Sequence, residues 1–499
     1  MPLDRRYAKN TFLAVIDAGT TSVRAIIYDL LGEVIESVQK PITQITPEAG
    51  WLSQDPEEIY LTALACINEA LAAGTSKMGT MPKLEGIAIT NQRETACVWS
   101  STSGKPLYNA IVWSDVRNEY LVEEYRHRNE EWKRITGLPV STYFTNLKIK
   151  WMIDNVDLDL SDCLFGTVDS WLIYKFTGRH ITEISNASRT GLFDIRTYEW
   201  SQDLLDELNI PRSALPEIVN SAETYGMLLD SVPCLARNIP IAGCAGDQQA
   251  SLIGHGCISP FTQKVTLGTG AFALCNTGDQ LVAKDGLLST IAYRLRSTDP
   301  VQYALEGSVA CAGSAVEWMA KVGILSKPQE IDELLRNIED SGGVYFVPAL
   351  SGLFAPRWDP NARGTILGIS LHTDRGHIAR ACLEGTAVQV AEVIEEMSET
   401  NRIFALNADG GLTNCKSQMQ ILANIMMCDV QKPKDCEITA LGAMLLCSVA
   451  LGFYDSLEQA HSEIHMNWEI FKPDMSTKKR MSFLEGWDRA VNRAMNWVQ

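Results

Sequence analysis

Apolar and small residues follow the same order at two distant places in the chain. Residues 12–29 read FLAVIDAGTTSVRAIIYD, in which two apolar runs enclose a small-residue turn at 18–22. Residues 263–276 read QKVTLGTGAFALCN and repeat that order around a turn at 267–270. Short runs rich in β-branched and aromatic residues around a Gly-containing turn predict a β-hairpin. Because one hairpin opens each half of the chain, we expect two similar α/β domains that face a shared cleft.

Helix and strand signals alternate between the two hairpins and beyond. Asp55 before Pro56 predicts a helix start, and Gly74 is expected to end that helix. An amphipathic pattern predicts a long helix over 372–398. Further strands are predicted at 86–92 and 94–99. A third small-residue turn, Asp409-Gly410-Gly411, follows a mixed segment around 404–406.

The region from 200 to 260 changes character and suggests a hinge. It holds Pro-containing loops and the Gly-rich stretch AGCAGDQQASLIGHG at 242–256. We therefore predict an N-terminal domain over residues 1–255 and a C-terminal domain over 256–499. A chain of 499 residues is long enough for two cores.

Composition limits the class of partner and the compartment. The net charge of −18 argues against nucleic acid and against an anionic membrane surface. The 13 cysteines are scattered and odd in number, which favours reduced thiols and a cytoplasmic location. The uncharged run 438–454 is short against the ~20 residues that span a bilayer, so we expect a buried helix and no transmembrane segment.

The turn of the first hairpin suits phosphate. Its backbone N–H groups and its Thr and Ser hydroxyls match phosphate oxygens, although no GxxxxGK[ST] loop is present. Asp17 ends the first strand, where a carboxylate can hold Mg²⁺. An ordinary surface hairpin explains the same pattern.

Arg93 and Glu94 are adjacent at the end of a predicted strand. Charged side chains are seldom buried unless they are paired or bind a ligand. The five donors of Arg and the acceptors of Glu together suit the neighbouring hydroxyls of a polyol. The alternative is a local ion pair at the strand end.

Asp247 is the one acidic side chain within the Gly-rich stretch at the hinge. A carboxylate held in a cleft can take the proton of a hydroxyl while its oxygen attacks a γ-phosphoryl group. The alternative is an Asp that caps the following helix, which is a common use of Asp.

Two longer patterns resemble the FGGY carbohydrate kinases of the actin-like ATPase superfamily. The first is YFTNLK at 143–148 with Trp151 and Asp154-Asn155, and the second runs from GTILGI at 364–369 to Glu384. The resemblance extends from about Phe12 to about Trp497. Seven stretches resemble the members that phosphorylate glycerol: TNQRET (90–95), GKPLYNAIVWSD (104–115), AGDQQASL (245–252), GTGAF (268–272), YALEG (303–307), SGLFAP (351–356) and ITALGAM (438–444).

The resemblance implies two ribonuclease-H-like domains around a deep catalytic cleft. It implies transfer of a phosphoryl group from ATP, with Mg²⁺, to a terminal hydroxyl of glycerol, and Asp247 as the general base. By position, the residues at glycerol would be Arg93, Glu94, Trp113, Tyr143, Asp247, Gln248 and Phe272. Those at the nucleotide would be Thr20, Thr21, Ser22, Arg24, Gly268, Thr269, Gly313, Glu317, Gly411 and Cys415, with Asp17 and Asp247 at the metal.

Some positions depart from the family's usual residues. Ala18 and Glu317 stand where Gln is usual, and Cys415 stands where Asn is usual. These departures concern the nucleotide side, so we expect altered ATP affinity and an unchanged class of acceptor. Two alternatives remain, a kinase for another small polyol such as erythritol and a catalytically weak binding protein of this fold. A homodimer or a monomer–dimer equilibrium is also expected.

Overall fold

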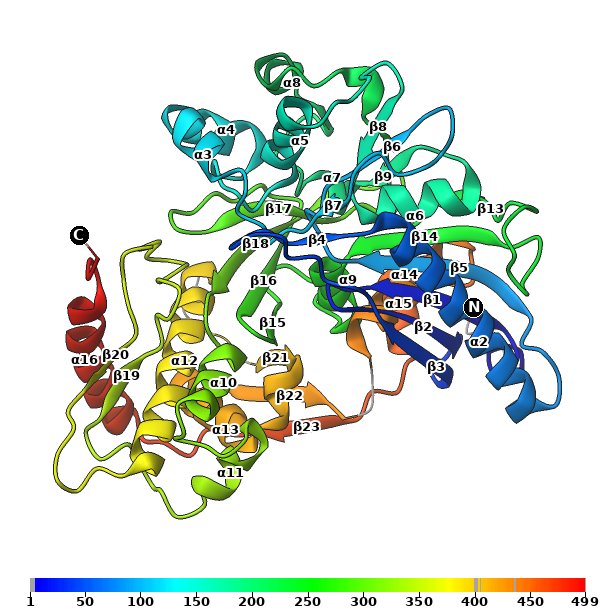
Figure 1. Ribbon diagram of the computed structural model, residues 1–499. Coiled ribbons are helices and arrows are strands. Elements are labelled where there is room, and N and C mark those ends of the chain that lie inside the picture. Colours follow the sequence, from blue (N-terminus) through cyan, green and yellow to red (C-terminus); the bar gives the residue numbers. More distant parts are fainter. Residues whose placement is uncertain (1–4, 399–402, 404, 435–436, 499) are drawn as a thin grey trace.

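The computed structural model describes residues 5–398, 403, 405–434 and 437–498. Figure 1 shows two main sheets with helices around each, and a further helical layer beside the first sheet. Strands and helices are mixed along the whole described chain, but the predicted alternation is interrupted by runs of strands, such as those within residues 263–309, and by runs of helices, such as those within residues 119–155. Every cysteine in the described ranges is a buried free thiol, which agrees with the expectation of reduced thiols.

The first sheet contains the first predicted hairpin. Its order is β13-β14-β5-β1-β2-β3, in which β1 is antiparallel to β2 and parallel to β5. Its strands are β1 (Phe12–Ala18), β2 (Ser22–Asp29), β3 (Val34–Pro41), β5 (Leu84–Asn91), β13 (Thr224–Met227) and β14 (Pro240–Gly246). The predicted strand at 86–92 is thereby confirmed, whereas that at 94–99 is shorter and later, as β6 (Cys97–Ser100).

The first sheet lies between two layers of helices. Ala14 and Ile16 of β1 belong to the core on one face, which is shared with helix α2 (Pro56–Met78) and α6 (Val168–Thr177). Leu13 and Val15 face the opposite way. Successive side chains of a strand point to opposite faces, so an uninterrupted apolar strand is the pattern of a sheet covered on both sides.

The second sheet contains the second predicted hairpin and has the order β17-β18-β16-β15-β21-β22-β23. Its strands are β15 (Gln263–Leu267), β16 (Ala271–Gly278), β17 (Leu288–Tyr293), β18 (Gln302–Val309), β21 (Ala405–Asp409), β22 (Asp429–Pro433) and β23 (Trp468–Phe471). The mixed segment before the third small-residue turn belongs to β21 from Ala405 on, and Phe404 lies outside the described residues. Parallel pairing of β15 with β21 places Thr266 opposite Asp409.

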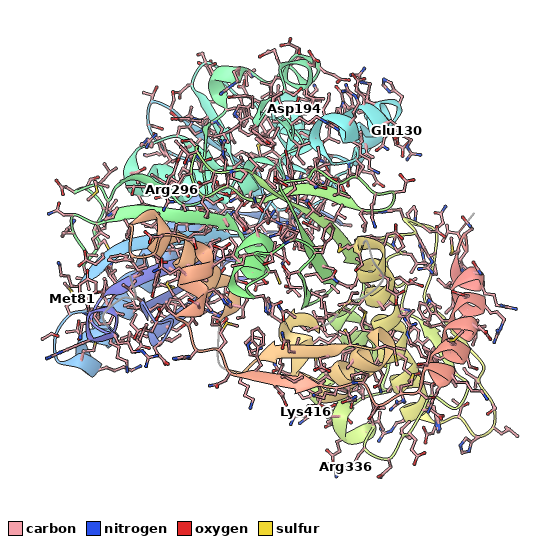
Figure 2. The ribbon with its side chains drawn as sticks, turned by 180° about the vertical axis from the view of Figure 1, so that it is seen from behind. Met81, Glu130, Asp194, Arg296, Arg336 and Lys416 are labelled. Atoms are coloured by element: carbon pink, nitrogen blue, oxygen red, sulfur yellow. The ribbon has the colours of Figure 1, made fainter. Side chains whose placement is uncertain are left out.

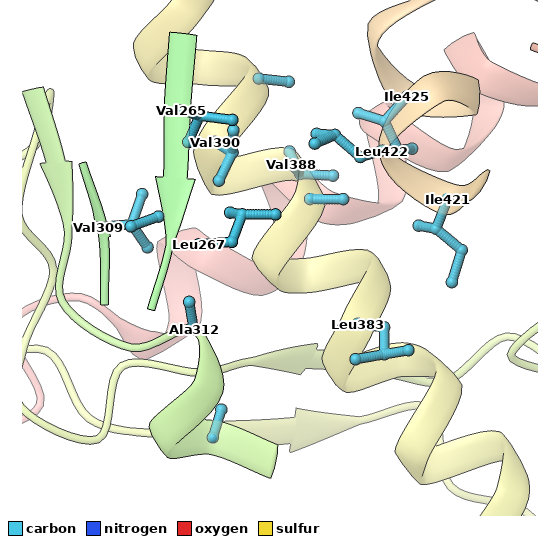
Figure 3. Close-up of a cluster of buried hydrophobic side chains, with 14 of the residues drawn as sticks. Val265, Leu267, Val309, Ala312, Leu383, Val388, Val390, Ile421, Leu422 and Ile425 are labelled. Atoms are coloured by element: carbon cyan, nitrogen blue, oxygen red, sulfur yellow. The ribbon is translucent and has the colours of Figure 1, made fainter. Parts of the chain in front are cut away.

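Helix α12 (Arg375–Met397) covers the second sheet and fills its core. Figure 3 shows Val265 and Leu267 of β15 against Val390 and Val388 of this helix, with α13 (Lys416–Met426) on the other side of it. The helix predicted over 372–398 is confirmed. It begins after Asp374, whose carboxylate accepts the N–H groups of the first turn in a capping box.

The start of α2 is confirmed and its predicted end is wrong. Asp55 caps the helix by accepting the Glu57 N–H, but the helix continues to Met78. Gly79, with a φ of 75°, ends it instead. Gly74 lies inside the helix because the chain packs closely there: a Cβ at this position would lie 3.0 Å from Cγ of Pro82.

Helix α14 (Ile438–Ala450) comes from the second half of the chain and packs on the first sheet. It shares a core with Leu13 and Val15 and lies against α9 (Asp247–Gly254). A Cβ at Gly442 would lie 1.8 Å from the Ala250 carbonyl oxygen, so glycine permits this contact. The buried helix predicted at 438–454 is therefore confirmed. The domain boundary predicted between residues 255 and 256 remains a prediction. The hydrophobic cores do not separate at that point, because α14, from after the boundary, shares a core with β1, from before it.

A layer of short helices lies beside the first sheet and includes α3 (Glu119–Tyr125), α4 (Asn129–Thr136), α5 (Thr145–Asn155) and α8 (Gln202–Leu208). Tyr303 of β18 contacts this layer, and its hydroxyl lies 2.8 Å from that of Tyr198. Figure 2 shows Glu130 and Arg336 at the periphery of the molecule, unlike the buried charges described below. Within the described ranges, no helix has the length and hydropathy needed to cross a membrane.

Candidate active site

Arg93 and Glu94 lie in the turn after β5, where the two sheets meet, and are only 3% and 2% exposed. Nη1 and Nη2 of Arg93 donate to the two carboxylate oxygens of Glu306 at 2.6 and 2.7 Å. Nε of Arg189 donates to Oε1 of Glu94 at 2.6 Å. Arg93 and Glu94 themselves approach only to 3.6 Å. The local ion pair considered from the sequence is therefore a minor contact, because each residue has a stronger partner elsewhere.

Asp247 is the first residue of α9 and stands directly beside Arg93. Its Oδ1 lies 3.5 Å from Nε of Arg93 and accepts the backbone N–H of Gln248 at 2.8 Å. Gly246 occupies the capping position of the helix, so Asp247 is not its N-cap. Burial raises the pKa of the Asp247 carboxyl to about 6, and Arg93 opposes that shift. Such a carboxylate is still ionised at neutral pH and is a stronger base than an exposed Asp.

Asp17 is the penultimate residue of β1 and pairs across the hairpin with Arg24. Burial raises the pKa of its carboxyl to about 7, Arg24 lowers it, and the negative charge of Asp247 raises it further. Two carboxylates that repel each other suit a divalent cation. Mg²⁺ is commonly held by one or two carboxylates together with substrate phosphates. No cluster of three or more metal-ligating side chains occurs among the described residues, and the pair fits this sparser mode.

Trp113, Tyr143 and Phe272 come together from three parts of the chain. The ring of Trp113 meets that of Tyr143 edge-on at 5.5 Å and that of Phe272 at 6.3 Å. Nε1 of Trp113 donates to Oγ1 of Thr20 at 3.0 Å. The three rings are only partly buried, so they form an accessible apolar wall beside the first turn. Burial also raises the pKa of Tyr143, which keeps its phenol a neutral donor.

The turn of the second hairpin rests on the start of helix α10 (Gly313–Lys321). The Gly313 N–H donates to the Gly268 carbonyl oxygen at 2.9 Å, and the Thr269 carbonyl oxygen accepts the Ala312 and Ser314 N–H groups. A Cβ on Gly313 would lie 2.6 Å from the Gly268 oxygen. Thr269 itself is exposed at the tip. The structure thus brings Gly268, Thr269 and Gly313 together.

The remaining first-turn residues have partners within the protein. Oγ of Ser22 accepts from Nε2 of Gln39 at 2.6 Å, and Arg24 pairs with both Gln39 and Glu437. Thr21 is exposed.

Gly411, Glu317 and Cys415 differ in how far they are open to a ligand. Gly411 starts a short 3₁₀ helix and has open space around it, and Glu317 is exposed on α10. Cys415 is 7% exposed, and its thiol donates to Oδ1 of Asp332 at 3.4 Å and accepts from the Gln418 N–H. Its place beside a nucleobase remains a prediction.

The comparisons with known proteins agree with this geometry. Residues 12–254 match the N-terminal domain of the FGGY family of carbohydrate kinases, and residues 263–451 match its C-terminal domain. The chain belongs to this family.

Within this family, curated relatives and solved structures show members to which the chain is similar in sequence and in fold. It is 42% identical to glycerol kinases of Brucella anthropi and Beutenbergia cavernae, over 98% of the chain and 99% and 98% of those proteins. A crystal structure of Plasmodium falciparum glycerol kinase with ADP has a TM-score of 0.91 and 36% identity, covering 98% of this chain and 99% of that one. A gluconate kinase from Lactobacillus acidophilus, at 23% identity, 97% coverage of both chains and a TM-score of 0.86, shares the fold. The predicted fold of two ribonuclease-H-like α/β domains is confirmed.

Three charged residues of this kinase's site were not found from the sequence: Arg189, Lys264 and Glu306. Lys264 is fully buried, and its ammonium donates to Oε1 of Gln248 and to Oγ1 of Thr266, at 2.5 and 2.8 Å. The sequence did contain a signal for Lys264 and Glu306 that could have identified them. Lys264 and Glu306 are charged residues inside otherwise apolar strands, and buried charges are either paired or functional.

Proposed function

We propose that this protein is a glycerol kinase, which transfers the γ-phosphoryl group of ATP to a terminal hydroxyl of glycerol. The observation that carries the proposal is the contact of Asp247 with Arg93, next to Glu94 and close to an aromatic wall. The names of relatives at 42% identity support the same acceptor.

Recognition of a three-carbon polyol follows from the chemistry of these side chains. Arg93 donates, Glu94 accepts, and the neutral phenol of Tyr143 does both, so neighbouring hydroxyls find matched partners. Trp113 and Phe272 offer apolar faces to the carbon chain. Gln248, held by Lys264, is proposed to lie at the edge of the same site.

Phosphoryl transfer needs in-line placement and neutralised charge more than covalent help. Asp247 would accept the proton of the attacking hydroxyl. The two hairpin turns, one from each sheet, would hold the phosphates through Thr20, Thr21, Ser22, Arg24, Gly268 and Thr269, with Gly313, Glu317, Gly411 and Cys415 toward the nucleoside. Asp17 and Asp247 would hold Mg²⁺, which supplies positive charge next to the phosphates when it is bound.

A coupled assay of ADP release tests the proposal. Purified protein is supplied with ATP and Mg²⁺ and with glycerol, erythritol, xylulose or no acceptor. Release with glycerol well above the other three supports a glycerol kinase. A preference for erythritol would mean a different polyol kinase, and no release above the sample without acceptor would mean a binding protein of this fold. We further propose a cytoplasmic enzyme that forms a homodimer or a monomer–dimer equilibrium.

A further inference from the structure

Four buried side chains of alternating charge close a ring beneath the proposed glycerol site. Arg93 binds Glu306 through two hydrogen bonds, and Nη2 of Arg189 donates to Oε1 of the same Glu306 at 3.2 Å. Nε of Arg189 donates to Oε1 of Glu94, which lies 3.6 Å from Nε of Arg93. The four side chains, here called the charge ring, are no more than 3% exposed. With two positive and two negative charges the ring is neutral as a whole.

The charge ring joins the two sheets. Arg93 and Glu94 follow β5, and Arg189 follows the short helix α7 (Ile184–Ala187). Glu306 belongs to β18 of the second sheet, 213 positions after Arg93. Arg93 is therefore fixed directly by a residue from the other half of the chain, and Glu94 is linked to that residue through Arg189.

Glu94 also needs support because its backbone is strained. Its φ is 60°, in the left-handed region that non-glycine residues seldom adopt. Such strain persists where surrounding contacts impose it, and it is concentrated at functional sites. The Arg189 guanidinium holds the carboxylate, and the Thr145 hydroxyl donates to the Glu94 carbonyl oxygen at 3.0 Å.

We infer that Arg189 and Glu306 are positioning residues that determine polyol selectivity by orienting Glu94 and Arg93. The inference rests on the proposed function, since the polyol is what the oriented pair would bind. Glu306 takes two donors of Arg93 and leaves the Nε edge directed at Asp247, where the reacting hydroxyl is expected. Nη1 of Arg189 is buried and has no acceptor among the described residues, so the ring contains a buried donor group that no protein atom satisfies.

The test compares Glu306→Gln, Arg189→Lys and the double variant Arg189→Met/Glu306→Gln with the unmodified protein. The double variant removes one charge of each sign and so keeps the site neutral. KM for glycerol and for ATP, kcat, Tm and activity with 1,2-propanediol are measured. We expect KM for glycerol to rise at least tenfold and KM for ATP to change less than threefold. The preference for glycerol over 1,2-propanediol should fall at least tenfold.

Glu392→Gln is the matched control, because Glu392 is also bound by an arginine, Arg357, but belongs to α12, which contains none of the proposed site residues. It should lower Tm without changing KM for glycerol. The inference is overturned if the folded double variant keeps KM for glycerol within threefold, or if its activities with both acceptors fall equally. If the unmodified protein does not phosphorylate glycerol at all, the proposed function fails instead.

Discussion

Nε of Arg93 lies 3.5 Å from Oδ1 of Asp247, so the proposed base and a proposed polyol donor are direct neighbours. The arrangement sets two effects against each other. Burial disfavours the charged carboxylate and raises its pKa, while the guanidinium stabilises the charge and lowers it. The resulting pKa of about 6 lies close to neutral pH, where a general base combines ionisation with basicity.

Replacement of the base should remove turnover but not binding. Asp247→Asn keeps the size and the acceptor oxygen of the side chain and loses its basicity. We expect kcat to fall by ~10²–10⁴-fold with KM for glycerol nearly unchanged. Steady-state kinetics measure this, with Asp279→Asn on an exposed loop as the control. A kcat within tenfold of the unmodified protein would place the base elsewhere.

The pH dependence of catalysis should report the same carboxyl group and that of Asp17. Asp247 can accept a proton and Asp17 can hold a cation only when they are deprotonated. The value of kcat/KM should therefore begin to fall as the pH drops through about 7, where Asp17 gains a proton, and should fall more steeply below about 6, where Asp247 gains one as well. The profile is measured from pH 4.5 to 8 with stability checked at each point. A flat profile down to pH 5 would contradict the raised pKa of Asp247.

Asp17 should make the ligand-free protein less stable at neutral pH. Its folded-state pKa, about 7, is above the ordinary 3.8, so the folded state binds this proton more tightly than the unfolded chain. The contribution to stability is full below pH 3.8 and is lost as the pH rises through 7. Asp17→Asn should therefore raise the free energy of unfolding at pH 7.5 by about 1–3 kcal/mol.

Thermal unfolding without nucleotide or Mg²⁺ at pH 5 and pH 7.5 tests this prediction. The increase in Tm caused by Asp17→Asn should be smaller at pH 5, where the Asp17 carboxyl of the folded protein is already protonated. The same variant should lose most of its kinase activity, since it removes a proposed metal ligand. A lower Tm at pH 7.5 would show that the carboxylate stabilises the fold instead.

Trp113, a member of the aromatic wall, should support ATP binding through its hydrogen bond to Thr20 in the turn of the first hairpin. Trp113→Phe keeps an aromatic ring and removes the hydrogen bond to Thr20. The loss of one neutral hydrogen bond costs about 0.5–1.5 kcal/mol, or two- to tenfold in affinity. We expect KM for ATP to rise by that factor and KM for glycerol to change less.

Trp358→Phe provides the matched control, because the Trp358 indole donates to the Gly286 carbonyl oxygen on an exposed loop. Both variants lose one indole hydrogen bond, so only the location differs. An equal change in KM for ATP in the two variants would count against a specific role of the contact between Trp113 and Thr20.

Local pattern predicted much of the architecture. Both hairpins, the start of α2 at Asp55 and Pro56, and the buried helix α14 follow from spacing, caps and turn residues within a few positions. The end of α2 could not be predicted in this way. Gly74 lies inside the helix, where the absence of a side chain permits the close contact with Pro82, and it does not end the helix. Resemblance to a family supplied Trp113, Tyr143 and Phe272, which no local pattern distinguishes from core aromatics.

The sequence by itself determined the residue types at the site: a basic and an acidic residue after a strand, a lone Asp at the hinge and two small-residue turns. Only the tertiary structure decided their partners. Glu306 binds Arg93 from 213 positions away, Arg189 binds Glu94 from 95 positions away, and α14 joins the core of the first sheet. Local periodicity reports which face of an element is apolar, whereas the pairing of buried charges depends on which elements the whole fold brings together.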